Sequence, residues 1–334
     1  MSSPVPRKIH QPIHPLTRPR LDPQYIAIHD SHLQYIPRSE STPWGPDSRS
    51  LPGMPSHFSS APVAVKATRD IDLGLFNIRD FTPFGESPQK GWPVLLWFHG
   101  GGCVLGDIGS ENNFLTRLCT RAKCVVVTVD YRLAPENPFP AAVEDAATAL
   151  QWIVKSGKEE LGIDTTKIAV GGSSSGGNLA TVLSLFASTL TPAIQLTFLV
   201  LTIPVIDQTA TSETSWSSNA NAPWLTPARM TWYRDMYLTN PEDSKKWIAS
   251  PNLAPRDVLA KSPPAWMGVS ECDILCKEGK AYADLLKGLG VDVECVVYPG
   301  STHSILALDG TVLDLGRKLV VDACEALAKA FGTI

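Results

Sequence analysis

The sequence contains no C-x-x-C pair and no Cys/His cluster at the spacing of metal ligands, although it has seven cysteines. Scattered cysteines in an odd number are simplest to explain as reduced thiols of a cytosolic protein, with no bound metal. An excess of basic residues is also missing, because 29 Lys and Arg stand against 33 Asp and Glu. We therefore expect no nucleic-acid partner.

Long apolar runs are missing as well. Residues 1–14 contain Pro and His where a secretory signal needs an apolar core, and no run approaches the length of a membrane span. Residues 1–20 are basic and rich in proline, which predicts a short, solvated and poorly ordered terminus. A hydrophobic content of 43% is typical of a globular protein. We expect a cytoplasmic protein without stable membrane insertion.

The most informative stretch is a glycine- and serine-rich segment between a predicted strand and a predicted helix. The pattern G-x-S-x-G fits it in one register, with Gly172, Ser174 and Gly176. At such a junction the serine adopts a strained backbone conformation that presents its hydroxyl at the end of the sheet. The amide of Ser175 lies at the helix N-terminus, which favours negative charge. A turn that only caps the helix is the alternative explanation.

A second glycine motif follows the apolar run at 94–98, where His99 precedes Gly100, Gly101 and Gly102. Consecutive glycines after a strand allow backbone amides to converge on one point without interfering side chains, as a developing oxyanion requires. A flexible turn is the alternative, but a plain turn rarely needs such a run, whose ordering costs entropy. We predict that His99 holds the loop by hydrogen bonding rather than acting in catalysis.

Around these motifs, short apolar runs alternate with helical patterns, which predicts a mainly parallel sheet with helices on both faces. Strands are expected at 71–81, 94–98, 124–129, 167–170, 194–205, 264–269 and 291–298, and helices at 111–122, 139–156, 175–188, 278–289 and 313–331. Ligands of such sheets bind at the carboxyl ends of the strands, and both glycine motifs lie at those ends.

The alternation breaks at 207–250, a segment rich in aromatic residues. An insertion this long between two strands is usually a lid or a pocket wall. Simple packing of the aromatic side chains onto the core is the alternative for any one of them. We assign Trp216 and Trp224 to substrate binding.

Two later strands supply the partners that a nucleophilic serine needs, because Asp273 and His303 each follow a predicted strand. A serine hydroxyl requires a base to take its proton, and the base requires an acid that fixes its tautomer and stabilises its cation. The chain order Ser174, Asp273, His303 is that of an α/β-hydrolase triad. Glu271 is the competing acid.

With these motifs in place, the chain resembles the hormone-sensitive-lipase-like group of α/β-hydrolase esterases from about residue 94 to residue 303. The resemblance is carried, in chain order, by His99-Gly100-Gly101-Gly102, Gly106-Asp107, Asp130-Tyr131-Arg132-Leu133-Ala134-Pro135-Glu136, Phe139-Pro140-Ala141-Ala142-Val143-Glu144-Asp145, Ser174 with Gly176-Gly177-Asn178, Leu225-Thr226, Ser250-Pro251, Asp273-Ile274-Leu275 and His303. It implies an α/β-hydrolase fold, with an eight-stranded, mostly parallel sheet flanked by helices and a helical cap. It also implies ester hydrolysis without metal or cofactor, with the amides of Gly101, Gly102 and Ser175 as the oxyanion hole.

The resemblance divides the chain into four segments. Residues 1–60 and the insertion 207–250 form the expected cap, whereas residues 61–206 and 251–334 form the two parts of the hydrolase core. A homodimer through an exposed edge strand is compatible with the resemblance.

The chain departs from the family pattern at three positions near the glycine motifs. Ser173 and Ser175 stand where the family commonly has Asp and Ala, and Cys103 stands where an aromatic residue often follows the glycines. None of these changes removes a catalytic atom. We expect Cys103 to face the mouth of the site, to contact the substrate and to make the protein sensitive to bulky thiol reagents.

The predicted function is hydrolysis of short- to medium-chain acyl esters through an acyl-enzyme, with a small-molecule ester as the partner. Two alternatives stay open. A non-catalytic small-molecule receptor on the same scaffold is disfavoured by the retained His303. An amidase would use the same triad, and the sequence does not distinguish it from an esterase.

Overall fold

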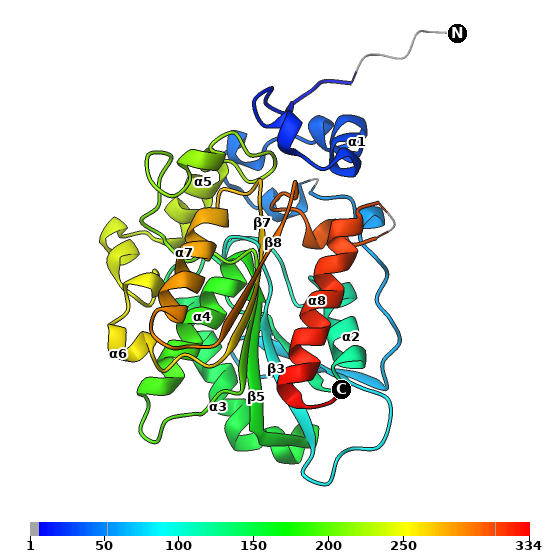
Figure 1. Cartoon of the computed structure of the whole chain (residues 1–334), viewed down its shortest axis with the longest axis vertical. Helices are drawn as coiled ribbons and strands as arrows, with labels where there is room; N and C mark the ends of the chain where they lie inside the picture. Colours follow the sequence, from blue (N-terminus) through cyan, green and yellow to red (C-terminus); the bar gives the residue numbers. More distant parts are fainter. Residues whose placement is uncertain (1–6, 52, 311) are drawn as a thin grey trace.

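An eight-stranded sheet organises the computed structural model, which describes residues 7–51, 53–310 and 312–334. The strands are β1 (Ala67–Asp72), β2 (Asn77–Thr82), β3 (Trp92–Phe98), β4 (Val125–Val129), β5 (Ile163–Ser173), β6 (Phe198–Thr202), β7 (Ala265–Ser270) and β8 (Val293–Tyr298). They lie in the order β1-β2-β4-β3-β5-β6-β7-β8. The β1/β2 and β2/β4 pairs are antiparallel, and every pair from β4 to β8 is parallel (Figure 1). The expected eight-stranded, mostly parallel sheet is confirmed.

Helices cover both faces of this sheet. They are α1 (Pro23–Ser31), α2 (Asn112–Arg121), α3 (Ala141–Leu161), α4 (Ser174–Thr189), α5 (Pro227–Tyr237), α6 (Arg256–Leu259), α7 (Cys276–Lys287) and α8 (Asp314–Phe331). α2 and α8 pack together on one face, while α3, α4 and α7 cover the other (Figure 1). This arrangement is the one that alternating strands and helices predict.

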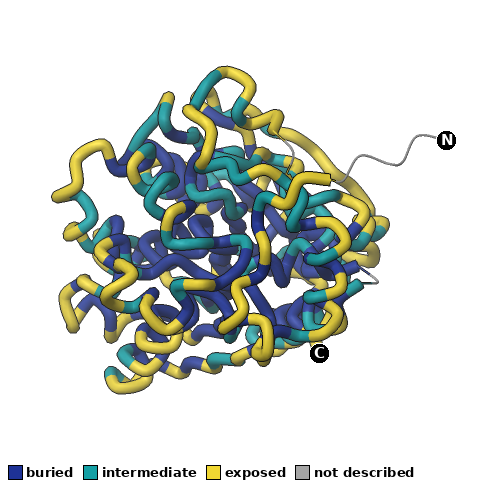
Figure 2. Tube along the Cα trace, turned by 90° about the horizontal axis from the view of Figure 1, so that it is seen from above, coloured by how far each residue is buried: buried dark blue, intermediate teal, exposed yellow. Residues whose placement is uncertain are grey.

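Strand β3 shows why the central strands have continuous apolar sequences. All seven of its residues are buried. Val94, Leu96 and Phe98 pack with α3, α4 and α7, whereas Leu95 and Trp97 pack with α2 and α8. A strand covered on both faces has no side that water can reach, so it carries no polar alternation. Figure 2 shows the buried residues in the interior, with exposed segments around them.

The edge of the sheet differs from the single strand predicted at 71–81. The chain reverses at 73–76, where the Leu73 N–H donates to Phe76 O at 3.0 Å and Gly74 has a φ of 93°. β1 and β2 therefore form an antiparallel hairpin. The apolar pattern continues through this turn, and Gly74 is the local signal of the reversal because glycine tolerates a positive φ.

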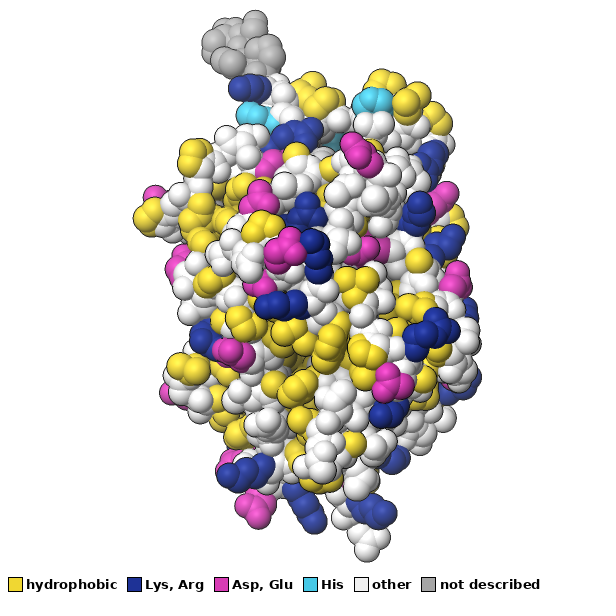
Figure 3. All heavy atoms as spheres, turned by 90° about the vertical axis from the view of Figure 1, so that its left-hand side faces the viewer, with side chains coloured by type: hydrophobic (Ala, Val, Ile, Leu, Met, Phe, Trp, Pro, Cys, Tyr) yellow, Lys and Arg dark blue, Asp and Glu magenta, His cyan; other side chains and the backbone are white. Residues whose placement is uncertain are grey.

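Charged side chains of both signs are interspersed on the left-hand face of the molecule (Figure 3). That face therefore carries no continuous field of one sign. Among the residues that the structure describes, no helix combines the length and the apolar character needed to cross a membrane.

The N-terminal segment is more closely packed than the sequence predicts. Gln11, Ile13 and Thr17 are buried, and the Thr17 hydroxyl donates to Asn221 O of the insertion at 3.1 Å. The prediction of a solvated terminus is therefore wrong at these three positions, whereas most of the other residues of 7–20 are exposed. Residues 1–6, which belong to the same prediction, lie outside the described residues.

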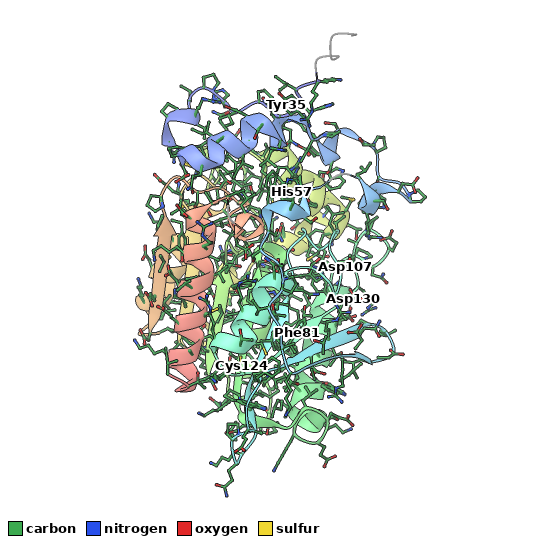
Figure 4. The ribbon with its side chains drawn as sticks, turned by 90° about the vertical axis from the view of Figure 1, so that its right-hand side faces the viewer. Tyr35, His57, Phe81, Asp107, Cys124 and Asp130 are labelled. Carbon is green, nitrogen blue, oxygen red and sulfur yellow. The ribbon has the colours of Figure 1, made fainter. Side chains whose placement is uncertain are left out.

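The N-terminal segment, described at residues 7–51 and 53–60, and the insertion 207–250 lie together over the carboxyl ends of the strands. The Asp22 N–H donates to Gly300 O, just beyond β8, at 3.0 Å, and Arg20 Nη1 donates to Asn219 Oδ1 at 3.0 Å. α1 and α5 accordingly occupy the same end of the molecule in Figure 1. Figure 4 marks the N-terminal segment by Tyr35 and His57. Phe81 of β2 and Cys124, which directly precedes β4, lie lower in that view.

Candidate active site

Ser174, His303 and Asp273 form one chain of hydrogen bonds. His303 Nε2 lies 3.0 Å from Ser174 Oγ, and His303 Nδ1 lies 2.7 Å from Asp273 Oδ2. Because a carboxylate only accepts, Nδ1 carries the proton, which leaves Nε2 of the neutral ring to accept the serine proton. The three side chains are thus within the reach that a base-activated serine needs.

The geometry favours Asp273 over Glu271 as the acid. The Asp273 side chain is 1% exposed, and its Oδ1 also accepts the Leu275 N–H at 3.1 Å. Glu271 instead accepts the Gly300 N–H at 2.8 Å, in the turn after β8. Its carboxylate therefore stabilises the chain that leads to His303, without contacting the imidazole.

The sheet brings these residues together because β5, β6, β7 and β8 are parallel neighbours. Ser174 follows β5 directly, whereas Asp273 and His303 follow β7 and β8. Ser174 has a φ of 51°, a conformation that strains a residue with a side chain. A Cβ at Gly176 would lie 2.0 Å from Phe98 O, so only glycine lets α4 approach the end of β3 this closely.

The glycine loop after β3 brings exposed backbone next to Ser174. Gly101 and Gly102 have φ values of 126° and 68°, and both line the same cavity as Ser174 and Ser175. A Cβ at Gly102 would lie 2.4 Å from the Tyr233 ring, so α5 packs directly onto this loop. Backbone without side chains is able to present N–H groups to a negatively charged oxygen.

His99 holds this loop by hydrogen bonding, as the sequence analysis expects. Its Nδ1 lies 2.7 Å from Gly100 O, and its ring stacks on Tyr131 with 4.4 Å between the centroids. The Tyr131 hydroxyl in turn donates to His99 O at 2.8 Å. The buried rings of His99 and Tyr131, which follow the neighbouring strands β3 and β4, therefore fix the start of the loop.

A cavity of about 270 Å³ lies over Ser174. The loops that carry Ser174, His303 and the glycines form one wall. The insertion forms another through residues that include Trp224, Met230 and Tyr233. Met54 contributes from the N-terminal segment. A mainly apolar cavity with a few polar groups is typical of a small-molecule site.

Three buried polar atoms of this cavity have no hydrogen-bond partner in the described part of the chain. They are Ser175 Oγ, Gln208 Oε1 and Tyr237 Oη. Leaving such atoms unpaired costs free energy, because burial removes their contacts with water.

The structure separates the two tryptophans that the sequence analysis assigns to substrate binding. Trp224 lines the cavity. Trp216 does not line it but packs behind its wall, in a cluster with Leu225 and Met230, where it is 1% exposed and donates Nε1–H to Glu278 Oε2 at 3.2 Å. Glu278 belongs to α7, so Trp216 anchors the insertion to the core. This corrects its predicted role in substrate binding.

Cys103 lines the cavity but is only 2% exposed. Burial raises the pKa of its thiol to about 12. The thiolate is the nucleophilic form, so it is scarce at neutral pH. Burial and the raised pKa thus favour a slowly reacting thiol, which differs from the sensitivity to thiol reagents expected from the sequence.

Two acidic residues near the site were missed in the sequence analysis. Glu111 contacts both the glycine loop and the residue before Ser174. Glu40, in the N-terminal segment, pairs with Arg229 of α5 at 2.8 Å. Neither residue has a local signature, because each partner lies far away in the sequence.

No group of three His, Cys, Asp or Glu side chains that could hold a metal ion occurs within the residues described.

The chain is similar to known hydrolases over most of its length. A protein-family profile described as alpha/beta hydrolase fold matches residues 95–307. The chain is 39% identical to an AB hydrolase superfamily protein of Schizosaccharomyces pombe over 332 residues, which cover 96% of this chain and 97% of that one. It is 34% identical to an ethyl acetate hydrolase of Pseudomonas putida over 250 residues, 74% and 77% of the two chains. The solved structure of an ester hydrolase from the metagenome of Lake Arreo, complexed with a bipyridine phosphonate derivative, matches with a TM-score of 0.84 at 30% identity, covering 93% of this chain and 99% of that chain.

Proposed function

The chain belongs to the alpha/beta hydrolase fold family and is an esterase-type enzyme, and from this premise we propose that it is a serine carboxylesterase for short- to medium-chain acyl esters. The observation that carries the proposal is the hydrogen-bond chain from Ser174 through His303 to Asp273. A cavity of about 270 Å³ and the similarity to an ethyl acetate hydrolase support a small acyl group.

In the first half-reaction, Ser174 Oγ attacks the ester carbonyl carbon while His303 Nε2 takes the hydroxyl proton. Asp273 stabilises the imidazolium that forms. The carbonyl oxygen becomes negatively charged and accepts hydrogen bonds from the amides of Gly101, Gly102 and Ser175. The intermediate then collapses, the C–O bond to the alcohol breaks, and His303 gives its proton to the leaving oxygen.

In the second half-reaction, water takes the place of the alcohol. His303 Nε2 accepts a proton from water as the water oxygen attacks the acyl carbon. The bond between the acyl carbon and Ser174 Oγ breaks, Ser174 regains its proton from His303, and the carboxylic acid leaves. The same base thus serves both steps.

The N-terminal segment and the insertion act in this proposal as one cap over the cavity. The Glu40–Arg229 ion pair joins them, and Tyr233 of the insertion contacts Gly102. Met54 and Trp224 bring one cavity-lining side chain from each segment. The cap encloses the acyl group and limits access of water to the reacting atoms.

The test compares the hydrolysis of p-nitrophenyl acetate, butyrate, octanoate and laurate by the wild type and by Ser174→Ala. We expect wild-type rates that decline with chain length, and a loss of about 10⁴-fold or more in the variant. Ser212→Ala, which changes an exposed serine of the insertion, is the matched control and should keep wild-type rates.

Two results would contradict the proposal. If the wild type and Ser174→Ala were folded and equally inert on all four esters, a non-catalytic receptor would explain the protein better. If the wild type cleaved p-nitroacetanilide faster than p-nitrophenyl acetate, the enzyme would be an amidase in its preference.

A further inference from the structure

One carboxylate connects the two backbone segments that flank Ser174. Glu111 lies between the glycine loop and α2. Its Oε1 accepts the Gly100 N–H at 3.1 Å and the Ser173 hydroxyl, and its Oε2 accepts the Trp97 Nε1–H at 2.8 Å. Gly100 belongs to the glycine loop after β3, whereas Ser173 is the last residue of β5. The carboxylate therefore bridges the two central strands at their carboxyl ends.

The two bridged segments are in close contact. A Cβ at Gly100 would lie 2.8 Å from Ser173 Oγ and 3.4 Å from Ser174 Cβ. Glu111 itself has a φ of 64°, which is strained for a residue with a side chain, and it lines the cavity over Ser174. Backbone strain that persists beside reactive groups points to a functional constraint on the residue that carries it.

We propose that Glu111 is a positioning residue that holds the oxyanion loop in register with the nucleophile, with Ser173 as its donor partner. The inference rests on the proposed function. A carboxylate offers only acceptors, so it satisfies several donors at once, and each of these hydrogen bonds is strengthened by its charge. Without it, the peptide that carries the Gly100 N–H keeps its hydrogen bond from Tyr131 at His99 O but loses its partner at the N–H, so the following glycine amides are held less firmly relative to Ser174.

The same contact accounts for the departure from the family pattern at Ser173. An aspartate there would bring a second carboxylate to within hydrogen-bond distance of Glu111, and two such charges repel each other strongly. Serine supplies a proton to the shared hydrogen bond instead. The junction, meaning the hydrogen-bonded group of Gly100, Glu111 and Ser173, thus contains a single carboxylate, which is that of Glu111.

The first experiment measures kcat and KM for p-nitrophenyl butyrate. For Glu111→Ala we expect kcat to fall about 10- to 100-fold with KM within about 3-fold, because a loosened oxyanion loop weakens the transition state more than substrate binding. Glu111→Gln leaves one donor without an acceptor, so its kcat should fall less than that of Glu111→Ala. Ser173→Ala removes one hydroxyl and should lower kcat severalfold. Glu213→Ala changes an exposed acid of the insertion and should leave kcat unchanged.

Thermal unfolding of each variant separates a change in the site from a loss of folding. Ser173→Ala is the mildest change and keeps the test valid if Glu111→Ala does not fold. Values of kcat for Ser173→Ala and Glu111→Gln that match Glu213→Ala would overturn the proposal. An inert wild type would contradict the esterase function itself, so the two failures are distinguishable.

A second experiment tests the charge relation through Ser173→Asp. The pKa of the introduced carboxyl should be raised by its charged neighbour, so that activity falls as pH rises through that pKa and the pair loses its shared proton. The double variant Ser173→Asp/Glu111→Gln has no second charge and should not show this fall. Parallel pH profiles for the two variants would refute the charge relation.

Other ionisable groups near the junction are present in both Ser173→Asp and the double variant, so their effects on the two pH profiles cancel in the comparison. They are His99, Asp130 and Tyr131, in the loops beside β3, and His303, which lines the same cavity. Burial raises the pKa of Tyr131 well above its usual range, so its hydroxyl stays neutral throughout.

Discussion

Glu40 and Arg229 form a buried ion pair, in which Glu40 Oε2 lies 2.8 Å from Arg229 Nε. Their side chains are 7% and 5% exposed. The pair joins the N-terminal segment to α5, and the Arg229 guanidinium also lies 5.1 Å from the centre of the Trp224 ring. The ion pair between these distant segments thus lies next to Trp224, a residue of the cavity wall.

Replacing Glu40 with Gln should destabilise the protein, because it leaves the Arg229 charge buried without its counter-charge. We expect the free energy of unfolding, measured in urea, to fall by about 3 kcal/mol. The double variant Glu40→Gln/Arg229→Met should lose less free energy of unfolding than Glu40→Gln alone, because it leaves no unpaired Arg229 charge. Glu86→Gln, at an exposed acid, is the control. Unchanged stability in Glu40→Gln would show that the pair contributes nothing.

Replacing Asp273 with Asn should lower kcat on the order of 10⁴-fold, because the amide favours the imidazole tautomer that cannot accept the serine proton. Glu271→Gln is the matched control, since it removes the competing acid while keeping an acceptor for the Gly300 N–H. It should lose less than about 10-fold. Steady-state kinetics on p-nitrophenyl butyrate decide between them, and a larger loss in Glu271→Gln would reverse the assignment of the acid.

The stability of the protein should depend on pH through Glu278. Burial raises the pKa of this carboxyl to about 8, although the N–H groups of Ile206 and Trp216 donate to it and favour its charged form. In the unfolded chain the group titrates near 4.3. Between these two pKa values the folded protein keeps the Glu278 proton that the unfolded chain has lost. The contribution of Glu278 to the free energy of unfolding is therefore full below about pH 4.3 and is lost as the pH rises to about 8.

Urea unfolding of the wild type and Glu278→Gln across this range measures the effect. The variant has no titrating group at this position, so its stability should decline less with rising pH. Glu213→Gln, at an exposed acid, should follow the wild type. Equal slopes for the wild type and Glu278→Gln would disprove the assignment.

Cys103 should resist alkylation in the folded protein. Iodoacetamide reacts with the thiolate, and burial both shields this thiol and raises its pKa to about 12. Peptide mass spectrometry should find Cys103 labelled more slowly than the half-buried Cys295. Rapid labelling of Cys103 together with loss of activity would restore the role first expected for it.

Local patterns were sufficient to predict most of the fold and the residues of the candidate triad. Buried parallel strands are continuous apolar runs, and ligand sites follow their carboxyl ends, so Ser174, Asp273 and His303 could be located without knowing how the chain packs. The exception in the sheet is the hairpin at 67–82, where the apolar pattern runs through the turn.

What the sequence could not predict depends on contacts between distant segments. Trp216 and Trp224 look equivalent along the chain, and only packing sends one to Glu278 and the other to the cavity. Glu111 resembles any acid at the start of a helix, because its three donors come from other parts of the fold. A long-range hydrogen bond leaves no periodic trace in the sequence.

The division of β3 between two hydrophobic cores has a consequence for how substitutions combine. Val94, Leu96 and Phe98 share neighbours on one face, while Leu95 and Trp97 share a different set on the other. Substitutions that do not share neighbours change stability almost additively. Substitutions in the two helical layers, on opposite faces of the sheet, should therefore combine almost additively, so that a loss of packing in one layer can be compensated only within that layer.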